Sequence, residues 1–142
     1  MGRRDDDTPL RDPRASKPAI LIVEDELLIR MSLADHLEEC GFSVLEASNP
    51  AEAIRLINMW PVRIDLVFSD VNMPGDMTGI ELAQWIGKNR PSLPVILASA
   101  DAAKADVAQA LCANRAFFAK PYDFDVVTAS MREIIAAHNA AN

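Results

Sequence analysis

The stretch Ala19-Ile-Leu-Ile-Val-Glu-Asp25 predicts how this chain folds. Its five apolar residues are typical of a strand that is buried on both faces of a parallel sheet. The two acids that follow, Glu24 and Asp25, stand where such a strand would end. In open α/β sheets, ligands bind outside the carboxyl ends of the strands. The stretch therefore predicts both a fold class and the place of a site.

Three further apolar runs lead into a polar residue in the same way. If all these runs are parallel strands, their polar residues meet at one edge of the sheet. Three carboxylates at that edge would suit a hard divalent cation, and a hydroxyl and an ammonium would suit a phosphoryl group. The residues are Asp70 after Leu66-Val-Phe68, Ser99 after Val95-Ile-Leu-Ala98, and Lys120 after Ala116-Phe-Phe-Ala119.

Strand and helix patterns alternate along the chain from Lys17 onward. Strict alternation of this kind implies a parallel sheet with right-handed crossovers and helices on both faces. The first helix carries an apolar stripe at helical spacing, which consists of Leu27, Leu28, Met31, Ala34 and Leu37. The expected strands lie at about 19–24, 42–46, 64–69, 94–98 and 115–119, and the expected helices at about 26–40, 50–60, 79–89, 102–113 and 123–138.

Composition limits the classes of function. The chain has 142 residues, of which half are hydrophobic, and this suits one domain with a real core. A formal net charge of −7 argues against a general nucleic-acid binder. No apolar run approaches the ~18 residues of a membrane span. The charged start of the chain, residues 1–8, precedes no apolar region of the signal type. We therefore expect a cytoplasmic protein without nucleic-acid or membrane partners.

Asp70 is the candidate nucleophile, because a carboxylate can attack phosphorus and form an acyl phosphate. Taken alone, Asp70 is better explained as the opening of a turn. The adjacent acids Glu24 and Asp25 change that balance, since they repel each other unless a cation such as Mg²⁺ or Mn²⁺ offsets them. The alternative is that these acids form the first turn of a helix, where the dipole favours them. That alternative does not explain why a hydroxyl and an ammonium that suit a phosphoryl group follow the other strands.

Four segments together resemble the receiver domain of bacterial two-component response regulators. They occur in the family's order over about residues 18–139, and the spacings are 45 residues from Asp25 to Asp70, 29 to Ser99 and 21 to Lys120. The resemblance implies a flavodoxin-like, doubly wound (βα)5 fold with a five-stranded parallel sheet in the strand order 2-1-3-4-5. The segments are Ile20-Leu-Ile-Val-Glu-Asp-Glu26, Asp70-Val-Asn-Met-Pro74 with Gly79-Ile-Glu-Leu82, Ala98-Ser-Ala100, and Phe117-Phe-Ala-Lys-Pro121.

The resemblance implies a role for each acid. Asp70 would be the phosphoacceptor. Glu24 and Asp25 would hold Mg²⁺, with Mn²⁺ as the alternative ion, together with Asp70 and the backbone carbonyl of Asn72. Glu24 stands where the family more often has Asp, which moves the carboxylate out by one methylene. The loop from Asp70 to Gly79 is expected to be one residue longer than usual.

The resemblance also implies the residues that respond to phosphorylation. Ser99 would be the switch hydroxyl and Lys120 the phosphate-binding lysine. Phe117 matches the aromatic switch position, and the peptide bond between Lys120 and Pro121 is a candidate for the cis form. The stretch from Ser99 to Lys120 is expected to be one residue shorter than usual.

We expect a phosphorylation-activated switch rather than a conventional enzyme. It would take a phosphoryl group from a phosphohistidine of a sensor histidine kinase or histidine phosphotransfer protein, and would catalyse its own phosphorylation and autodephosphorylation. Residues 1–17 are expected to be a disordered or loosely attached leader and residues 18–140 the receiver domain. Without an output domain, the signal would pass to a protein partner through the fourth helix, fifth strand and fifth helix. The protein would be a monomer or a weak dimer.

Two alternatives stay open from the residues. A degenerate receiver could act as a docking adaptor without phosphorylation, although the acids, Asp70 and Lys120 argue against it. A metal-dependent phosphatase could work through an aspartyl phosphate. Such enzymes commonly need a second acid two residues after the nucleophile, and Asn72 occupies that position.

Overall fold

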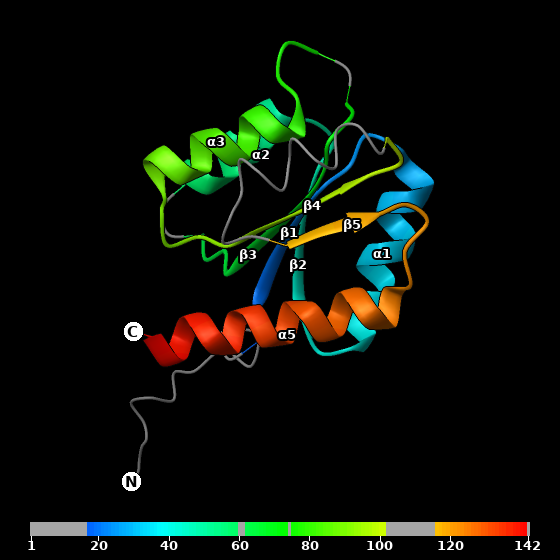
Figure 1. Cartoon of the computed structure of the whole chain (residues 1–142), viewed down its shortest axis with the longest axis vertical. Helices are drawn as coiled ribbons and strands as arrows, with labels where there is room; N and C mark the ends of the chain where they lie inside the picture. The colour runs from blue at the N-terminus through cyan, green and yellow to red at the C-terminus, as the bar shows by residue number, and fades with distance from the viewer. Residues whose placement is uncertain (1–16, 60–61, 74, 102–115, 142) are drawn as a thin grey trace, which may run out of the picture.

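A five-stranded parallel sheet forms the centre of the molecule (Figure 1). The computed structural model describes residues 17–59, 62–73, 75–101 and 116–141. The strand order is β2-β1-β3-β4-β5, which confirms the predicted topology. The strands are β1 (Ala19–Val23), β2 (Ser43–Ala47), β3 (Leu66–Asp70), β4 (Val95–Ser99) and β5 (Ala116–Ala119).

Helices cover both faces of this sheet. The helices α1 (Leu27–Glu39) and α5 (Phe124–Ala141) lie on one face, and α2 (Pro50–Asn58) and α3 (Gly79–Asn89) lie on the other (Figure 1). Their ends agree with the expected ranges to within a few residues. The helix expected at 102–113 lies outside the described residues. No helix in the described ranges is long and apolar enough to cross a membrane.

The alternation of side chains along β1 creates two cores. All five residues of β1 are buried. Ile20 and Ile22 pack into the core beneath α1 and α5, whereas Leu21 and Val23 pack into the core beneath α2 and α3. Successive residues of a strand point to opposite faces, so a strand between two helical layers must be apolar throughout. This explains why the opening stretch of the sequence is continuously apolar.

The apolar stripe expected on the first helix is only partly buried. Ala34 and Leu37 are buried with Leu33, but Leu28 is 78% exposed, and Leu27 and Met31 are exposed as well. The helix begins four residues after β1 ends, so its first turn lies at the edge of the sheet. Helical spacing predicts which side chains share a face, but it does not predict how much of that face the sheet covers.

Candidate functional site

The sheet register brings the predicted polar residues to one edge. β1 and β3 are neighbours, and Val23 lies opposite Ser69, so the acids that follow Val23 and Ser69 are adjacent in space. β4 and β5 are neighbours in the same way, with Ser99 opposite Ala119. The backbone amide of Lys120 donates a hydrogen bond to the carbonyl of Ser99 at 2.9 Å. Residues far apart in the sequence therefore meet at the carboxyl ends of four strands.

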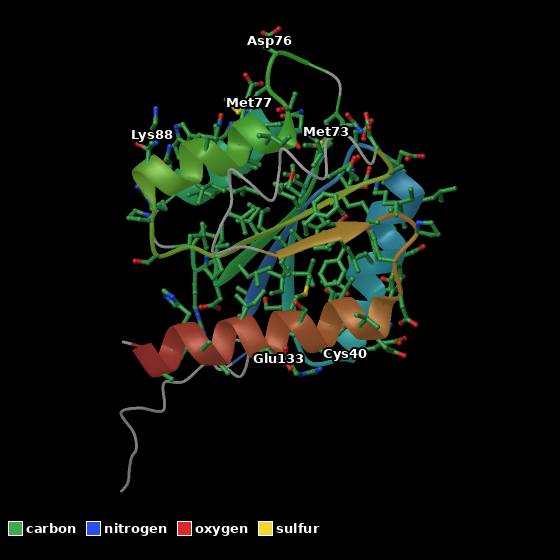
Figure 2. The ribbon with its side chains drawn as sticks, viewed as in Figure 1. Cys40, Met73, Asp76, Met77, Lys88 and Glu133 are labelled. Carbon is green, nitrogen blue, oxygen red and sulfur yellow. The ribbon has the colours of Figure 1, made fainter. Side chains whose placement is uncertain are left out.

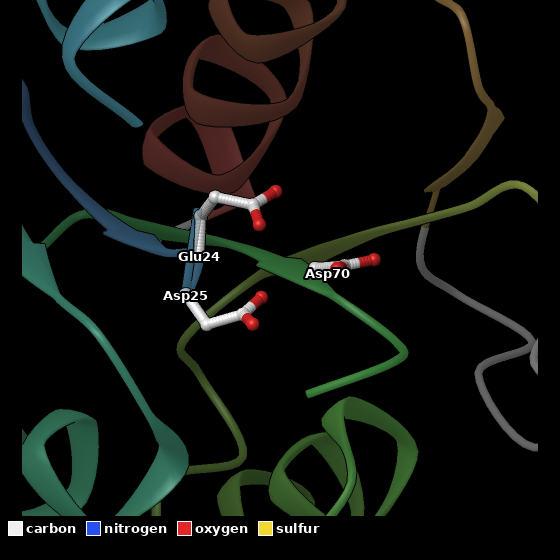
Figure 3. A group of neighbouring side chains, drawn as sticks. All are labelled: Glu24, Asp25 and Asp70. Atoms are coloured by element: carbon white, nitrogen blue, oxygen red, sulfur yellow. The ribbon is translucent and has the colours of Figure 1, made fainter. Parts of the chain in front are cut away.

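Three carboxylates extend to the same side at the ends of β1 and β3 (Figure 3). Glu24, Asp25 and Asp70 each offer an oxygen, and these oxygens lie within 4.8 Å of one another. Glu24 is 3% exposed and Asp70 is 6% exposed, whereas Asp25 is exposed to solvent. Carboxylate oxygens at this spacing, with one open side, fit a hard divalent cation such as Mg²⁺.

The ammonium of Lys120 contacts two of these acids, Glu24 and Asp70. Its Nζ atom lies 3.1 Å from Oε1 of Glu24 and 3.4 Å from Oδ1 of Asp70. The lysine side chain is itself mostly buried. An ammonium between two buried carboxylates offsets part of their charge, and its geometry suits a phosphoryl group that would bind on Asp70.

The pKa values at the site reflect burial and charge. Burial raises the pKa of both Glu24 and Asp70 above the ordinary values, even though Lys120 lowers each of them. Burial also lowers the pKa of Lys120, but its hydrogen bond to Glu24 and the charge of Asp70 outweigh burial and raise it. One ammonium faces two buried carboxylates, so it would leave net negative charge if both were ionised. A bound cation would offset that charge.

Ser99 is buried at the end of β4 and its oxygen accepts two hydrogen bonds. The donors are Nδ2 of Asn72 at 3.3 Å and the backbone amide of Asp101 at 3.0 Å. With its oxygen occupied as an acceptor, the hydroxyl can still donate its own hydrogen. The side chain of Asn72 thus links the loop after β3 to β4. Phosphoryl oxygens accept hydrogen bonds, so this hydroxyl fits the switch role that the resemblance implies.

Phe117 and Pro121 lie on either side of Lys120 in the sequence. Phe117 is partly buried and packs against the core beneath α2 and α3. The peptide bond between Lys120 and Pro121 is cis. The predicted acids, Ser99 and Lys120 therefore lie at this edge of the sheet, whereas Phe117 pairs with Leu97 within the sheet, two residues before the end of β5. The roles of these residues remain predictions.

Arg30 is a supporting residue that sequence reasoning missed. Its Nη1 atom donates a hydrogen bond to the carbonyl of Glu24 at 2.8 Å, and its Nε atom donates one to Glu46 at 2.9 Å. The arginine on α1 therefore holds the turn that carries the acid pair. The sequence gives only a weak indication of this role. Arg30 is a basic residue one helical turn after Glu26, on a helix that contains apolar, polar and charged residues.

Gly79, the first residue of α3, lies directly against the backbone of Asp70. A Cβ atom at this position would lie 2.1 Å from the carbonyl oxygen of Asp70. The amide of Gly79 donates a hydrogen bond to the carbonyl of Val71 at 2.9 Å. Only glycine allows the helix to approach the end of β3 this closely.

The fold and the edge site define a response regulator receiver domain. The family model for this domain matches residues 20–132, and the chain belongs to this family. Among its relatives, the chemotaxis protein CheY of Thermotoga maritima is 32% identical over 117 residues, which cover 81% of this chain and 95% of that protein. The transcriptional regulatory protein GlrR of Escherichia coli is 35% identical over 113 residues. The chain spans 25% of the length of GlrR.

Solved structures show the same fold. A CheY-like receiver domain protein from Methanospirillum hungatei is 26% identical and has a TM-score of 0.81, with 89% of this chain and 100% of that chain covered. The response regulator TrrA of Thermotoga maritima, solved in complex with Mg²⁺-BeF, is 29% identical and has a TM-score of 0.72. That match covers 82% of this chain and 98% of that one.

Proposed function

We propose that this chain is a phosphorylation-activated signalling switch whose phosphoacceptor is Asp70. The observation that carries the proposal is the position of Asp70, whose carboxylate lies beside those of Glu24 and Asp25 and 3.4 Å from the ammonium of Lys120. A buried carboxylate that belongs to a candidate cation site and also contacts an ammonium is suited to phosphoryl transfer. The similarity to a response regulator solved with Mg²⁺-BeF supports the same chemistry.

The donor is a phosphohistidine of a sensor histidine kinase or a histidine phosphotransfer protein. An oxygen of Asp70 forms a bond to phosphorus while the bond from phosphorus to the histidine nitrogen breaks. The imidazole leaves with the electron pair and takes a proton. Attack by water on the aspartyl phosphate later releases inorganic phosphate and restores the carboxylate. The chain promotes both steps on its own residue, so it is not a conventional enzyme with a separate substrate.

Glu24, Asp25 and Asp70, with the carbonyl of Asn72, would hold the Mg²⁺ ion, and Mn²⁺ is an alternative occupant. When bound, the ion supplies positive charge that offsets the negative charge of the phosphoryl oxygens. The ammonium of Lys120 pairs with a phosphoryl oxygen from the other side. Arg30 keeps the acid pair in place through the carbonyl of Glu24.

Ser99 and Phe117 carry the change to the surface. The Ser99 hydroxyl moves toward the phosphoryl group and donates a hydrogen bond to one of its oxygens. The space that Ser99 leaves is then available to the ring of Phe117. A local charge change then favours one of two conformations. The signal reaches a protein partner through the face that contains β5 and α5. The helix expected at 102–113, which the proposal includes in that face, lies outside the described residues.

An apolar groove of about 530 Å³ offers the donor a place to dock beside the site. Lys120 is one of the residues that line the groove, together with Leu28, Pro121 and Phe124. Leu28, on the first turn of α1, is largely exposed to solvent, so an apolar partner in the groove would cover it. A donor in this groove would hold its phosphohistidine close to Asp70.

The test is phosphorylation by a small donor. We expect the intact mass to rise by one phosphoryl group after incubation with a small phosphoramidate and Mg²⁺, and to stay unchanged when Mg²⁺ is removed. Asp70→Asn should abolish the gain. Asp76→Asn, the same chemical change at an exposed position in the following loop (Figure 2), should leave it intact. No gain with any donor would favour the docking adaptor instead.

A further inference from the structure

An imidazole, a thiol and a carboxylate meet where the end of α1 packs against the start of α5. His36 lies in the last turn of α1, Cys40 (Figure 2) caps that helix, and Asp125 lies in the first turn of α5. The Nε2 atom of His36 is 3.6 Å from Sγ of Cys40 and 3.4 Å from Oδ1 of Asp125. These side chains form a second group of metal-binding types, separate from the acids at the strand ends.

Both separations match those between the ligands of a tetrahedral zinc ion. With a Zn–S bond of about 2.3 Å and Zn–N and Zn–O bonds of about 2.0–2.1 Å, the sulfur and nitrogen ligands lie about 3.6 Å apart, and the nitrogen and oxygen ligands about 3.4 Å apart. His36 and Cys40 are four positions apart, which places them on the same face of a helix. Imidazole and thiolate ligands select Zn²⁺ and other borderline-soft cations rather than Mg²⁺.

Contacts with neighbouring residues hold both ligands of α1 in place. The ring of His36 packs against that of Phe124, with the centroids 5.3 Å apart. Arg132 donates a hydrogen bond to the backbone carbonyl of Cys40, and its guanidinium lies 5.0 Å from the centre of the Phe42 ring. The side chain of His36 is 24% exposed and Cys40 is partly buried. An ion can therefore reach these ligands from solvent with little rearrangement of α1.

The charge around the end of α1 favours a cation. The carboxyl end of a helix carries partial negative charge on its unpaired carbonyl groups. Three acids, Asp35, Glu38 and Glu39, are exposed on the same part of the helix. Arg132 opposes these charges with its guanidinium. The acids and the helix end together outweigh it, so a positive ion is attracted to this place.

Asp125 reaches the ion by a change of rotamer. Within the described ranges, the acids at the strand ends are the only three such side chains whose ligand atoms all lie within 4.8 Å of one another, so Cys40 and Asp125 are farther apart than that. The side chain of Asp125 is 87% exposed, and it can rotate in solvent toward an ion held by α1.

We propose that His36, Cys40 and Asp125 bind Zn²⁺, or another divalent cation of the same borderline-soft class, with water as the fourth ligand. The sulfur of Cys40 forms its bond to the ion as the thiol proton leaves to solvent, and His36 offers the lone pair of Nε2 while Nδ1 keeps its hydrogen. The affinity for Zn²⁺ should therefore rise with pH. The bound ion fastens the first turn of α5 to the last turn of α1. This inference does not depend on the proposed function.

The test titrates the full chain with Co²⁺, which takes the place of Zn²⁺ and reports its ligands. A thiolate bound to Co²⁺ gives a charge-transfer band in the near ultraviolet that oxygen ligands do not give, so the acids at the strand ends stay silent. We expect the band in the wild type, its disappearance when Zn²⁺ displaces Co²⁺, and no band in Cys40→Ser. The matched control is Cys112→Ser, which changes the other cysteine of the chain and should keep the band.

The Zn²⁺ affinity measured by this displacement gives the second readout. His36→Gln and Asp125→Asn should each weaken Zn²⁺ binding by about tenfold or more, as is typical when a partner of a metal site is lost. Their matched controls are His138→Gln, at the other histidine of the chain, and Asp123→Asn, at an exposed position two residues before Asp125. Both controls should bind Zn²⁺ as the wild type does.

Each outcome decides the proposal. The absence of a thiolate band in the wild type, or a band that survives Cys40→Ser, overturns the site. An affinity that His36→Gln or Asp125→Asn leaves unchanged overturns it as well. Loss of the band in a Cys40→Ser protein that keeps the circular dichroism of the wild type, together with both weakened affinities, supports the site. None of these results bears on phosphorylation of Asp70.

Discussion

Gly79→Ala should damage both the stability of the fold and the position of Asp70. The added Cβ atom would lie 2.1 Å from the carbonyl oxygen of Asp70 and 2.9 Å from the Cα atom of Val71. Ordinary van der Waals contact begins at 3.4 Å, so the start of α3 and the end of β3 must separate by about 1.3 Å. Both partners are backbone atoms, which cannot swing aside as a flexible side chain would.

The cost follows from two opposing effects. Overpacking of this kind costs about 1–3 kcal/mol, and the better helix propensity of alanine returns at most about 1 kcal/mol. Because the clash is with backbone at the very start of the helix, we expect the upper end of the cost and a net loss of about 2 kcal/mol in the free energy of unfolding. Phosphorylation of Asp70 should also slow, since the carboxylate moves with its backbone.

Urea unfolding followed by circular dichroism measures the loss. Gly87→Ala is the matched control, because Gly87 is exposed on the same helix. There the same substitution should raise stability by about 0.5–1 kcal/mol through helix propensity alone. If Gly79→Ala proved as stable as the wild type, or as stabilising as Gly87→Ala, the close approach of α3 to Asp70 would be refuted.

Three further predictions follow from the site and its supports. Asp70→Asn should raise the stability of the metal-free protein at neutral pH, because burial raises the pKa of Asp70 and makes its charged form costly. The gain in stability should shrink as the pH falls toward 3.8, the ordinary pKa of an aspartate, because below it the carboxyl group is protonated in both the folded and unfolded states. Urea titrations at several pH values test this, and a gain that grew on acidification would contradict it. Mg²⁺ at about one hundred times its dissociation constant should stabilise the wild type by about 2.7 kcal/mol in urea unfolding, and it should not stabilise Asp25→Asn. Equal stabilisation of both proteins would show that Asp25 is not a ligand of the cation. Thr78→Ala should cost about 1 kcal/mol, since the Thr78 hydroxyl accepts a hydrogen bond from the amide of Glu81 at the start of α3, whereas Gln84→Ala at an exposed position of the same helix should cost little.

Much of the fold could be predicted because the sheet is buried on both faces. A strand such as β1 has no solvent side, so it appears in the sequence as an unbroken apolar run whose end is marked by the first polar residue. The parallel arrangement then places Glu24, Asp70, Ser99 and Lys120 at one edge without any knowledge of side-chain geometry. The N-terminal cap of α2 is a local feature of the same kind, in which the side chain of Asn49 accepts a hydrogen bond from the backbone amide of Glu52, three residues later.

What escaped prediction depends on how elements sit against one another. The stripe on α1 was visible, but the exposure of Leu28 follows from where the helix begins relative to the sheet. The contact between Arg30 and the carbonyl of Glu24 depends on the reach and rotamer of a long side chain. The pairing of Glu24 with Lys120 joins residues 96 positions apart, and it depends on how the ends of β1 and β5 come together in the assembled sheet.

The central claim is that phosphoryl transfer occurs on Asp70, and reductive trapping tests it most directly. After incubation with a phosphodonor and Mg²⁺, borohydride reduces an acyl phosphate and converts the aspartate that carries it into homoserine. Peptide mapping should find homoserine at position 70 in the wild type, and unreduced aspartate at positions 25 and 76. A phosphorylated protein without homoserine at position 70, or with the reduced residue elsewhere, would contradict the account.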